Sequence, residues 1–248
     1  MALNLLDILN GILSFIFVII SLFVGFLILL RYFQYKEKIY FFVGTTWILI
    51  SEPWWPSSLS FLVSLSNGVG LSPTIYFIIG NTLVPLAIAL WLLAFTDFLF
   101  TEKRKMILSI FTIIGIIFEI IFFTLLSIDP ILIGNLNPPV DVSYNFFIMI
   151  FLFIFILIVV ISGLLFAHLS LKSNDPEVKL KGKLLVIAYI AFFIGALLDS
   201  SIRLNELGVV FVRLILIASA IFWYGGFLLP HWMKKLFLKQ KGEEKFST

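Results

Sequence analysis

The chain has 248 residues, of which 61% are hydrophobic and only 12% are charged, and its mean hydropathy is +1.15. Soluble domains carry roughly a quarter charged residues, so this composition excludes a soluble globular protein and predicts an all-α integral membrane protein. The absence of cysteine excludes disulfides, thiolate nucleophiles and cysteine-based zinc or iron–sulfur sites. The net charge of +3 comes almost wholly from one predicted face, so it indicates contact with lipid headgroups and not with nucleic acid.

Apolar segments long enough to cross the lipid bilayer follow one another along the whole chain. A span needs about 20 apolar residues. Seven segments qualify: 8–31, 39–63, 72–97, 106–128, 143–170, 184–201 and 207–230. The links between them are too short to hold a soluble domain. The sequence therefore predicts a seven-helix transmembrane domain over residues 1–233 and a basic cytoplasmic tail over 234–248.

Lysine and arginine identify the predicted cytoplasmic side, because short cytoplasmic loops collect them. The first link supplies three, the third three, the fifth four and the tail five, which makes 15 of the 17 basic residues. We therefore expect the N-terminus outside and the C-terminus inside. The first three and the last three spans then run in the same directions, which is compatible with a parallel repeat of three plus one plus three helices.

Five predicted helices place a polar or charged side chain in the outer half of the bilayer. With a rise of about 1.5 Å per residue, these side chains come to similar depths. They are Glu52, Asn81, Glu119, Asp199 and Arg213. An isolated charge at mid-membrane costs at least ~2.5–3.5 kcal/mol, so we expect these groups to face inward and to neutralise one another. Arg213 is the obligate partner, for which the three carboxylates compete.

The stretch from Glu52 to Trp55 marks the outer end of the expected cavity. Pro53 removes a backbone donor and strains the preceding turn, so the second helix should bend or break just after Glu52. Such an irregular point is tolerated only where it faces protein or a wet cavity. Trp54 and Trp55 either belong to the interfacial aromatic belt or wall a ligand pocket whose floor is Glu52.

Two interpretations of the charged residues stay open. Asp199 and Arg203 lie close to the outer interface, where contact with water or a structural ion pair would explain them. Glu119 and Arg213 are each the sole charge of a long apolar helix, which favours a functional role. Pro85 is expected to kink the third helix one turn beyond its polar residue, beside the same cavity.

Several functions are excluded or disfavoured by what the predicted spans lack. Every lysine lies in an inner link or in the tail, so a retinal Schiff base cannot form within a span, and no retinal is expected. His168 and His231 lie at the inner boundary without a third ligand, so no metal and no other cofactor is predicted. No nucleotide-binding, hydrolase or metalloprotease motif occurs, which disfavours an enzyme.

Three functional hypotheses remain. The leading one is a receptor-like sensor or ligand-binding membrane module, with an outward pocket and a basic inner face for a cytoplasmic partner or anionic lipid headgroups. The second is a small solute transporter coupled through Glu52 or Glu119. The nearly unbroken Ile, Leu, Phe and Val of the inner halves of four helices disfavour the transport path that it needs. The third is a structural or lipid-organising protein.

The seven-span layout with the N-terminus outside is similar to that of receptor-type bundles and of membrane sensor modules in prokaryotic signalling proteins. No sequence motif connects the chain to one of these groups. The excess of Ile, Phe, Leu and Lys over Ala and Gly is typical of AT-rich prokaryotic genomes. The expected location is therefore the plasma membrane of a prokaryote.

Overall fold

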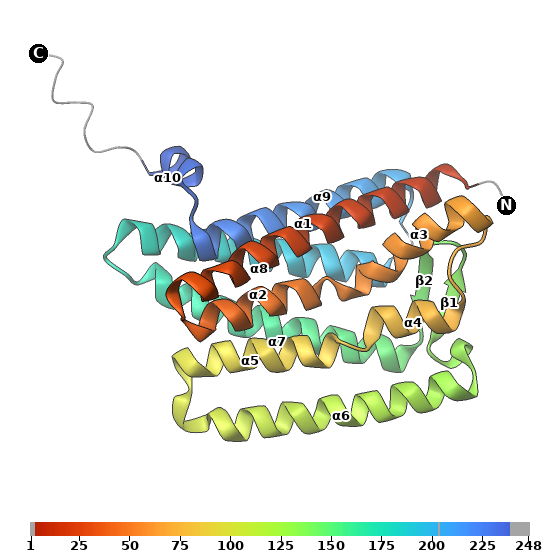
Figure 1. The fold of residues 1–248 in the computed structure, drawn as a ribbon, viewed down its shortest axis with the longest axis horizontal. Coiled ribbons are helices and arrows are strands. Elements are labelled where there is room, and N and C mark those ends of the chain that lie inside the picture. Colours follow the sequence, from red (N-terminus) through yellow and green to blue (C-terminus); the bar gives the residue numbers. More distant parts are fainter. Residues whose placement is uncertain (1–2, 203, 239–248) are drawn as a thin grey trace, which may run out of the picture.

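The computed structural model describes residues 3–202 and 204–238, which form a bundle of long helices that run along one axis of the molecule (Figure 1). The α-helices are α1 (Leu5–Tyr35), α2 (Lys38–Ile50), α3 (Trp55–Asn67), α4 (Pro73–Asn81), α5 (Val84–Leu99), α6 (Arg104–Ile128), α7 (Phe146–Leu171), α8 (Pro176–Ser201), α9 (Glu206–Leu228) and α10 (His231–Phe237). Short elements connect them: the 3-10 helices η1 (Glu52–Trp54), η2 (Thr101–Lys103) and η3 (Pro130–Leu132), and the strands β1 (Gly134–Asn137) and β2 (Asp141–Tyr144).

Six helical segments of the described chain are long and apolar enough to cross a membrane. They are Leu5–Tyr35, Pro73–Leu99, Thr101–Ile128, Phe146–Leu171, Pro176–Ser200 and Glu206–Leu228. The prediction of an all-α, multi-pass membrane protein in a lipid environment is therefore confirmed. The expected second span, residues 39–63, is not one of the six, because η1 divides it into α2 and α3, two helices of 13 residues each.

Two expected spans are interrupted beside a proline, as the sequence predicts. Pro53 lies in η1, between α2 and α3. Thr82 and Leu83 separate α4 from α5, directly before Pro85. Proline has no N–H and its ring crowds the preceding turn, so the backbone ladder opens at both points. The two breaks are joined by a hydrogen bond of 2.7 Å, which the backbone N–H of Leu83 donates to the Glu52 carboxylate.

The connections differ from those expected. α8 begins at Pro176, eight residues before the predicted span, because Asp175 caps it by accepting a hydrogen bond of 2.8 Å from the backbone N–H of Glu177. The link between α6 and α7 folds into an antiparallel β1–β2 hairpin, which the sequence did not predict. α10 spans the boundary placed between residues 233 and 234, so part of the expected tail is helical.

The β1–β2 hairpin is anchored to the bundle by hydroxyl groups of α3. Ser57 donates a hydrogen bond of 3.0 Å to the carbonyl oxygen of Val140, and Ser60 donates one of 2.5 Å to that of Pro139. Tyr76 of α4 donates to the Val140 carbonyl as well, at 3.0 Å. These bonds hold the hairpin across one end of the bundle, which we call the hairpin end (Figure 1).

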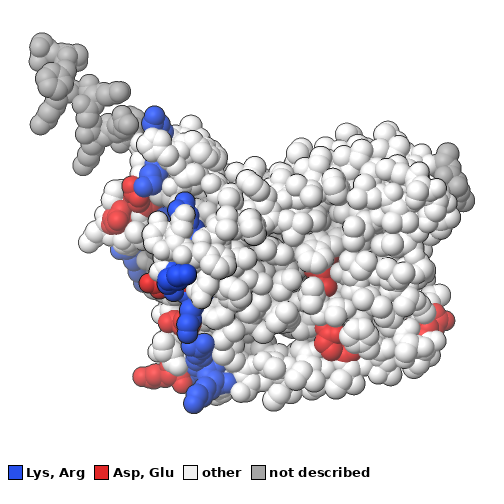
Figure 2. Space-filling view, viewed as in Figure 1, with Lys and Arg blue, Asp and Glu red and all other residues white. Residues whose placement is uncertain are grey.

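Lysine and arginine side chains gather at the opposite end of the molecule, which we call the basic end (Figure 2). The α1–α2, α5–α6 and α7–α8 connections meet there (Figure 1). Two ion pairs lie at this end, Arg104 with Asp97 and Lys234 with Glu177. The predicted clustering of basic links is thus confirmed for the described residues. Lys239, Lys241 and Lys245 of the expected tail lie outside them.

Helices α1 and α2 approach each other so closely that their backbones touch. A Cβ atom on Gly44 would lie 2.7 Å from the carbonyl oxygen of Gly25 and 2.7 Å from the backbone nitrogen of Leu29. A Cβ atom on Gly25 would lie 2.8 Å from the carbonyl oxygen of Gly44. Because neither backbone can yield as a flexible side chain would, the contact requires glycine on both helices.

Gly44→Leu is expected to lower the free energy of unfolding by about 1–3 kcal/mol or more, because the added side chain forces α1 and α2 apart. Unfolding in detergent micelles measures the effect. Thr112→Leu places the same leucine side chain on the exposed face of α6 and should leave stability nearly unchanged. Equal stability of Gly44→Leu and the wild type would refute the close α1–α2 contact.

Candidate functional site

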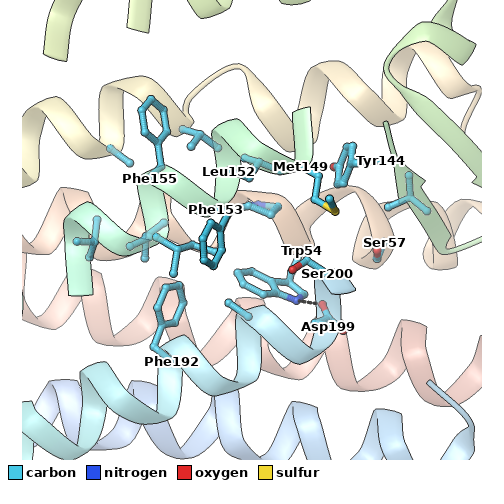
Figure 3. A pocket seen from close by; sticks show the side chains of 18 of the residues that line it. Trp54, Ser57, Tyr144, Met149, Leu152, Phe153, Phe155, Phe192, Asp199 and Ser200 are labelled. Atoms are coloured by element: carbon cyan, nitrogen blue, oxygen red, sulfur yellow. Dashed lines mark hydrogen bonds between the residues drawn. The ribbon is translucent and has the colours of Figure 1, made fainter. Parts of the chain in front are cut away.

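A cavity of about 130 Å³ lies between α7 and α8 near the hairpin end (Figure 3). Helix α5, η1 and the β1–β2 hairpin contribute to its wall, and α1, α2, α3 and α9 add one residue each. Phe153 of α7 and Ser200 of α8 line it and are both exposed, so the cavity opens between these two helices. A cavity that holds one water molecule has a volume of about 10–15 Å³ on the same scale. This cavity therefore has room for a small organic molecule.

Arg213 of α9 holds together the polar end of this cavity. Its side chain is 4% exposed, and its guanidinium donates a hydrogen bond of 2.7 Å from Nη1 to Oδ2 of Asp199. Nη2 donates a second hydrogen bond, of 2.7 Å, to Oδ1 of Asn10. The indole N–H of Trp54 donates to the same Asp199 oxygen at 2.8 Å (Figure 3). Charge-assisted hydrogen bonds of this kind are the strong ones, and here they connect α1, η1, α8 and α9.

The other end of the cavity is apolar. Phe155 of α7 and Phe192 of α8 lie there, away from Asp199 and Ser200 (Figure 3). Val159 and Ile88 add aliphatic surface from α7 and α5. The cavity thus combines a hydrogen-bonding end and an apolar end within one continuous space, which is the usual composition of a small-molecule site.

Four buried aromatic side chains close the bundle between the cavity and the basic end. We call them the aromatic plug, and they are Trp47, Trp91, Tyr189 and Trp223, each at most 2% exposed. The rings of Trp47 and Trp223 stack with centroids 4.3 Å apart. Phe192 lies between cavity and plug, because its ring is 6.1 Å from Trp54 and 6.0 Å from Trp47.

Glu52 does not line the cavity. Its side chain is 1% exposed, and Oε1 accepts the hydrogen bond from Leu83 at the α4–α5 break. Asn81 ends α4 at the same break, where its amide Nδ2 donates to the carbonyl oxygen of Phe77 at 2.9 Å and to Oη of Tyr144 at 3.3 Å. Tyr144 also lines the cavity, so it separates the cavity from the helix break.

Glu119 of α6 reaches the same helix break from the other side. α5 and α6 pack against each other, and a Cβ atom on Gly115 would lie 3.0 Å from Cβ of Pro85. The two helices run antiparallel, so Glu119, four residues beyond Gly115, comes level with Asn81, four residues before Pro85. Glu119 also lies within electrostatic range of Glu52. Both carboxylates therefore lie near the α4–α5 break.

The structure brings the predicted site residues into two neighbouring groups. The first group, at the polar end of the cavity, consists of Trp54, Asp199 and Arg213. The second group, at the α4–α5 break, consists of Glu52, Asn81 and Glu119. Of the three carboxylates that compete for Arg213, Asp199 is the one that pairs with it.

Trp55 and Arg203 belong to neither group. Trp55 is half-buried beside η1, where its indole N–H donates a hydrogen bond of 3.0 Å to the Ser51 hydroxyl. Of the two adjacent tryptophans, only Trp54 lines the cavity. Arg203 lies outside the described residues.

The sequence-based prediction did not include Asn10, Tyr144 or the hairpin residues of the cavity wall. Asn10 could have been predicted, because it is a polar residue in the outer part of the predicted first helix, at a depth comparable with that of Arg213. Tyr144 could not, because its position depends on the link between α6 and α7 folding back over the bundle.

A scan against protein-family models found no match for the chain, and a search of curated proteins found no similar sequence. The function must therefore be inferred from the chemistry of the two groups. Among the described residues, no cluster of three or more histidine, aspartate or glutamate side chains could hold a metal ion. The arrangement suits reversible binding of a molecule with one polar end.

Asp199→Asn is expected to lower the free energy of unfolding by about 3 kcal/mol, because Arg213 is left buried without a counter-charge. This is the low end of the usual range, since 21% of the Asp199 side chain remains exposed. Unfolding in micelles measures it, and a double variant with Arg213→Met should recover part of the loss. Asp97→Asn breaks a half-exposed pair at the basic end and should cost only about 0–1 kcal/mol. Equal losses from Asp199→Asn and Asp97→Asn would contradict the central role of the buried pair.

Proposed function

We propose that the protein is a receptor-like, ligand-binding membrane module whose ligand occupies the cavity between α7 and α8. The observation that supports this most strongly is the pairing of a hydrogen-bonding end and an apolar end within one cavity of about 130 Å³. A ligand that matches both ends is amphipathic, with a small polar head and an apolar body. It enters between α7 and α8, where the exposed Phe153 and Ser200 mark the opening.

The head group of this ligand donates hydrogen bonds. Arg213 is 3% exposed, and its positive charge already faces the Asp199 carboxylate. The charged groups that line the cavity otherwise are the carboxylates of Asp199 and Asp141, which can only accept. An ammonium or hydroxyl head therefore suits this end, whereas a carboxylate head would meet two like charges.

The aromatic plug favours binding over transport. Alternating access needs a wettable path on both sides of the binding site. The cavity faces Trp47 and Trp223 through Phe192, and the plug rings are at most 2% exposed, so they fill the bundle interior on the side of the basic end. Nε1 of Trp47 and of Trp223 and Oη of Tyr189 are buried there without a hydrogen-bond partner, so the closure rests on the packing of the rings. A transporter coupled through Glu52 or Glu119 remains the alternative, and a structural or lipid-organising protein the third.

We further propose that α2, η1 and α3 together form a seventh span. From Lys38 to Asn67 they comprise 30 residues, and a rise of ~1.5 Å per residue gives about 45 Å, more than the hydrocarbon thickness. With the basic end in the cytoplasm, the N-terminus is then outside, in the plasma membrane of a prokaryote. The basic end with α10 offers a surface for a cytoplasmic partner or for anionic headgroups.

Ligand class is tested with three probes of equal alkyl chain length: an alkylamine, an alkanol and a fatty acid. Binding is measured on protein in lipid nanodiscs, with empty nanodiscs subtracted. The amine and the alcohol should bind saturably and the fatty acid should not. Ala196→Leu, which fills the cavity wall, should weaken binding at least about tenfold, whereas Ala191→Leu on the same helix, outside the cavity lining, should not.

Preference for the fatty acid, or equal effects of the two alanine substitutions, would contradict the proposed ligand class and its location. In proteoliposomes, the bound probe should not be carried across the membrane. Solute flux under a proton gradient that disappears in Glu119→Gln would instead favour the transporter. An absence of both binding and flux would leave the structural role.

Topology is tested by single cysteines in a chain that has none of its own. A membrane-impermeant thiol reagent on intact cells should label Ser66→Cys and Asn137→Cys, but Glu37→Cys and Lys103→Cys only after permeabilisation. Labelling of Glu37 and Ser66 from the same side would refute the seventh span. Labelling of Lys103 from outside would reverse the orientation.

A further inference from the structure

We propose that Glu52 and Glu119 form a proton-binding site at the α4–α5 break, which holds one exchangeable proton between the two carboxyl groups. The site is separate from the cavity, whose ion pair uses neither residue. Its ligand is a proton from water. Its protein groups come from η1, where Glu52 accepts the Leu83 hydrogen bond at the break, and from α6, where Glu119 comes level with the break.

The first observation is a surplus of hydrogen-bond acceptors at the break. Four buried side-chain oxygens there have no hydrogen-bond partner: Oε2 of Glu52, Oδ1 of Asn81, and Oε1 and Oε2 of Glu119. Glu52 and Asn81 are 1% and 0% exposed, so their oxygens are not satisfied by bulk water. Pro85 adds a fifth acceptor, because it lacks the N–H that would otherwise bond the carbonyl of Asn81. Buried acceptors without donors are costly, and a proton converts one of them into a donor.

The second observation is the lack of a counter-charge. Arg213, the one lysine or arginine buried among the described residues, is already held by Asp199 and Asn10. On η1, α6 and the elements that pack against them, the other titratable or charged side chains are the tyrosines Tyr76 and Tyr144 at the break, and a set near the helix ends at a distance from it: Asp7, Arg31, Tyr32, Tyr35, Lys38, Tyr40, Asp97, Glu102, Lys103, Arg104, Lys105 and Asp129. Two carboxylates in apolar surroundings with no cation cannot both stay ionised at small cost.

The proton resides on Glu119, and Glu52 is the ionised partner. The Leu83 backbone N–H donates to Oε1 of Glu52 at the N-terminus of α5, where the helix dipole favours a negative charge. Neither oxygen of Glu119 receives such a donor. Protonation of Glu119 creates an O–H donor at the break, where Oε2 of Glu52 and Oδ1 of Asn81 lack a donor. One proton thereby removes the like-charge repulsion and satisfies two acceptors.

Dicyclohexylcarbodiimide, which reacts with protonated carboxyl groups inside membranes, tests the site in the full-length protein in nanodiscs. Mass spectrometry should find Glu119 modified and the exposed Glu102 unmodified. Above its midpoint pH, the modified fraction of Glu119 should fall about tenfold per pH unit. In Glu52→Gln the midpoint should move to lower pH, because the neighbouring negative charge is gone. Asp97→Asn, which breaks the ion pair at the basic end, should leave the midpoint in place.

Thermal unfolding provides a second readout that does not depend on the reagent. With the proton on Glu119, the folded protein holds one proton more than the unfolded chain below the midpoint pH found with the reagent, so wild-type stability should fall as pH rises toward that midpoint. Glu119→Gln should be folded and should lack that slope. An unmodified Glu119, a midpoint insensitive to Glu52→Gln, or protection by Na⁺ at constant pH would overturn the proton site, the last in favour of a metal cation. None of these outcomes depends on ligand binding in the cavity.

Discussion

The buried ion pair of Arg213 and Asp199 is the interaction on which the rest of the hairpin end depends. An unpaired guanidinium at this depth would destabilise α9 in the membrane, and the pair reduces that cost through hydrogen bonds to both terminal nitrogens, although Nε has no partner. Asn10 takes the second guanidinium nitrogen, and Trp54 donates to the Asp199 oxygen that Arg213 also uses. The four residues come from four different elements, so the polar end of the cavity and the packing of α1, η1, α8 and α9 are fixed together.

The two helix breaks explain why polar groups fall into two sets. Pro53 ends α2 within one turn and turns Trp54 toward Asp199, whereas Glu52, one residue earlier, points to the amide of Leu83. Neighbouring side chains in a tight 3-10 turn project in different directions, so one irregular segment supplies both the cavity and the α4–α5 break. Tyr144 stands between them, with its ring on the cavity and its hydroxyl on Asn81.

The sequence predicted those features that depend on local chemistry. Apolar length located the helices, prolines located both breaks, and the scarcity of cations in the spans made Arg213 the expected partner of a carboxylate. The pairing itself could not be predicted, because Glu52, Glu119 and Asp199 have similar depths and only the rotation of each helix distinguishes them. The hairpin was missed for a related reason: β1 and β2 have only four residues each, and Ser57 and Tyr76 of distant helices determine where they lie. α8 begins earlier than predicted because Asp175 caps it. The prediction located helices by apolar length, and the lysines of the link hid this polar first part of the helix.

We propose that the cavity opens toward the hairpin end, which the proposed topology places outside, and that the aromatic plug closes it toward the basic end. Ala196 lines the cavity and is 2% exposed, so a cysteine there reports access to the site itself. A membrane-impermeant thiol reagent applied to oriented proteoliposomes should modify Ala196→Cys from the outer side, and addition of the bound alkylamine should slow the reaction. No modification should occur when the reagent is present only on the side of the basic end. Reaction from that side at a comparable rate would mean that a continuous path passes the plug, and it would contradict the account of a binding module without transport.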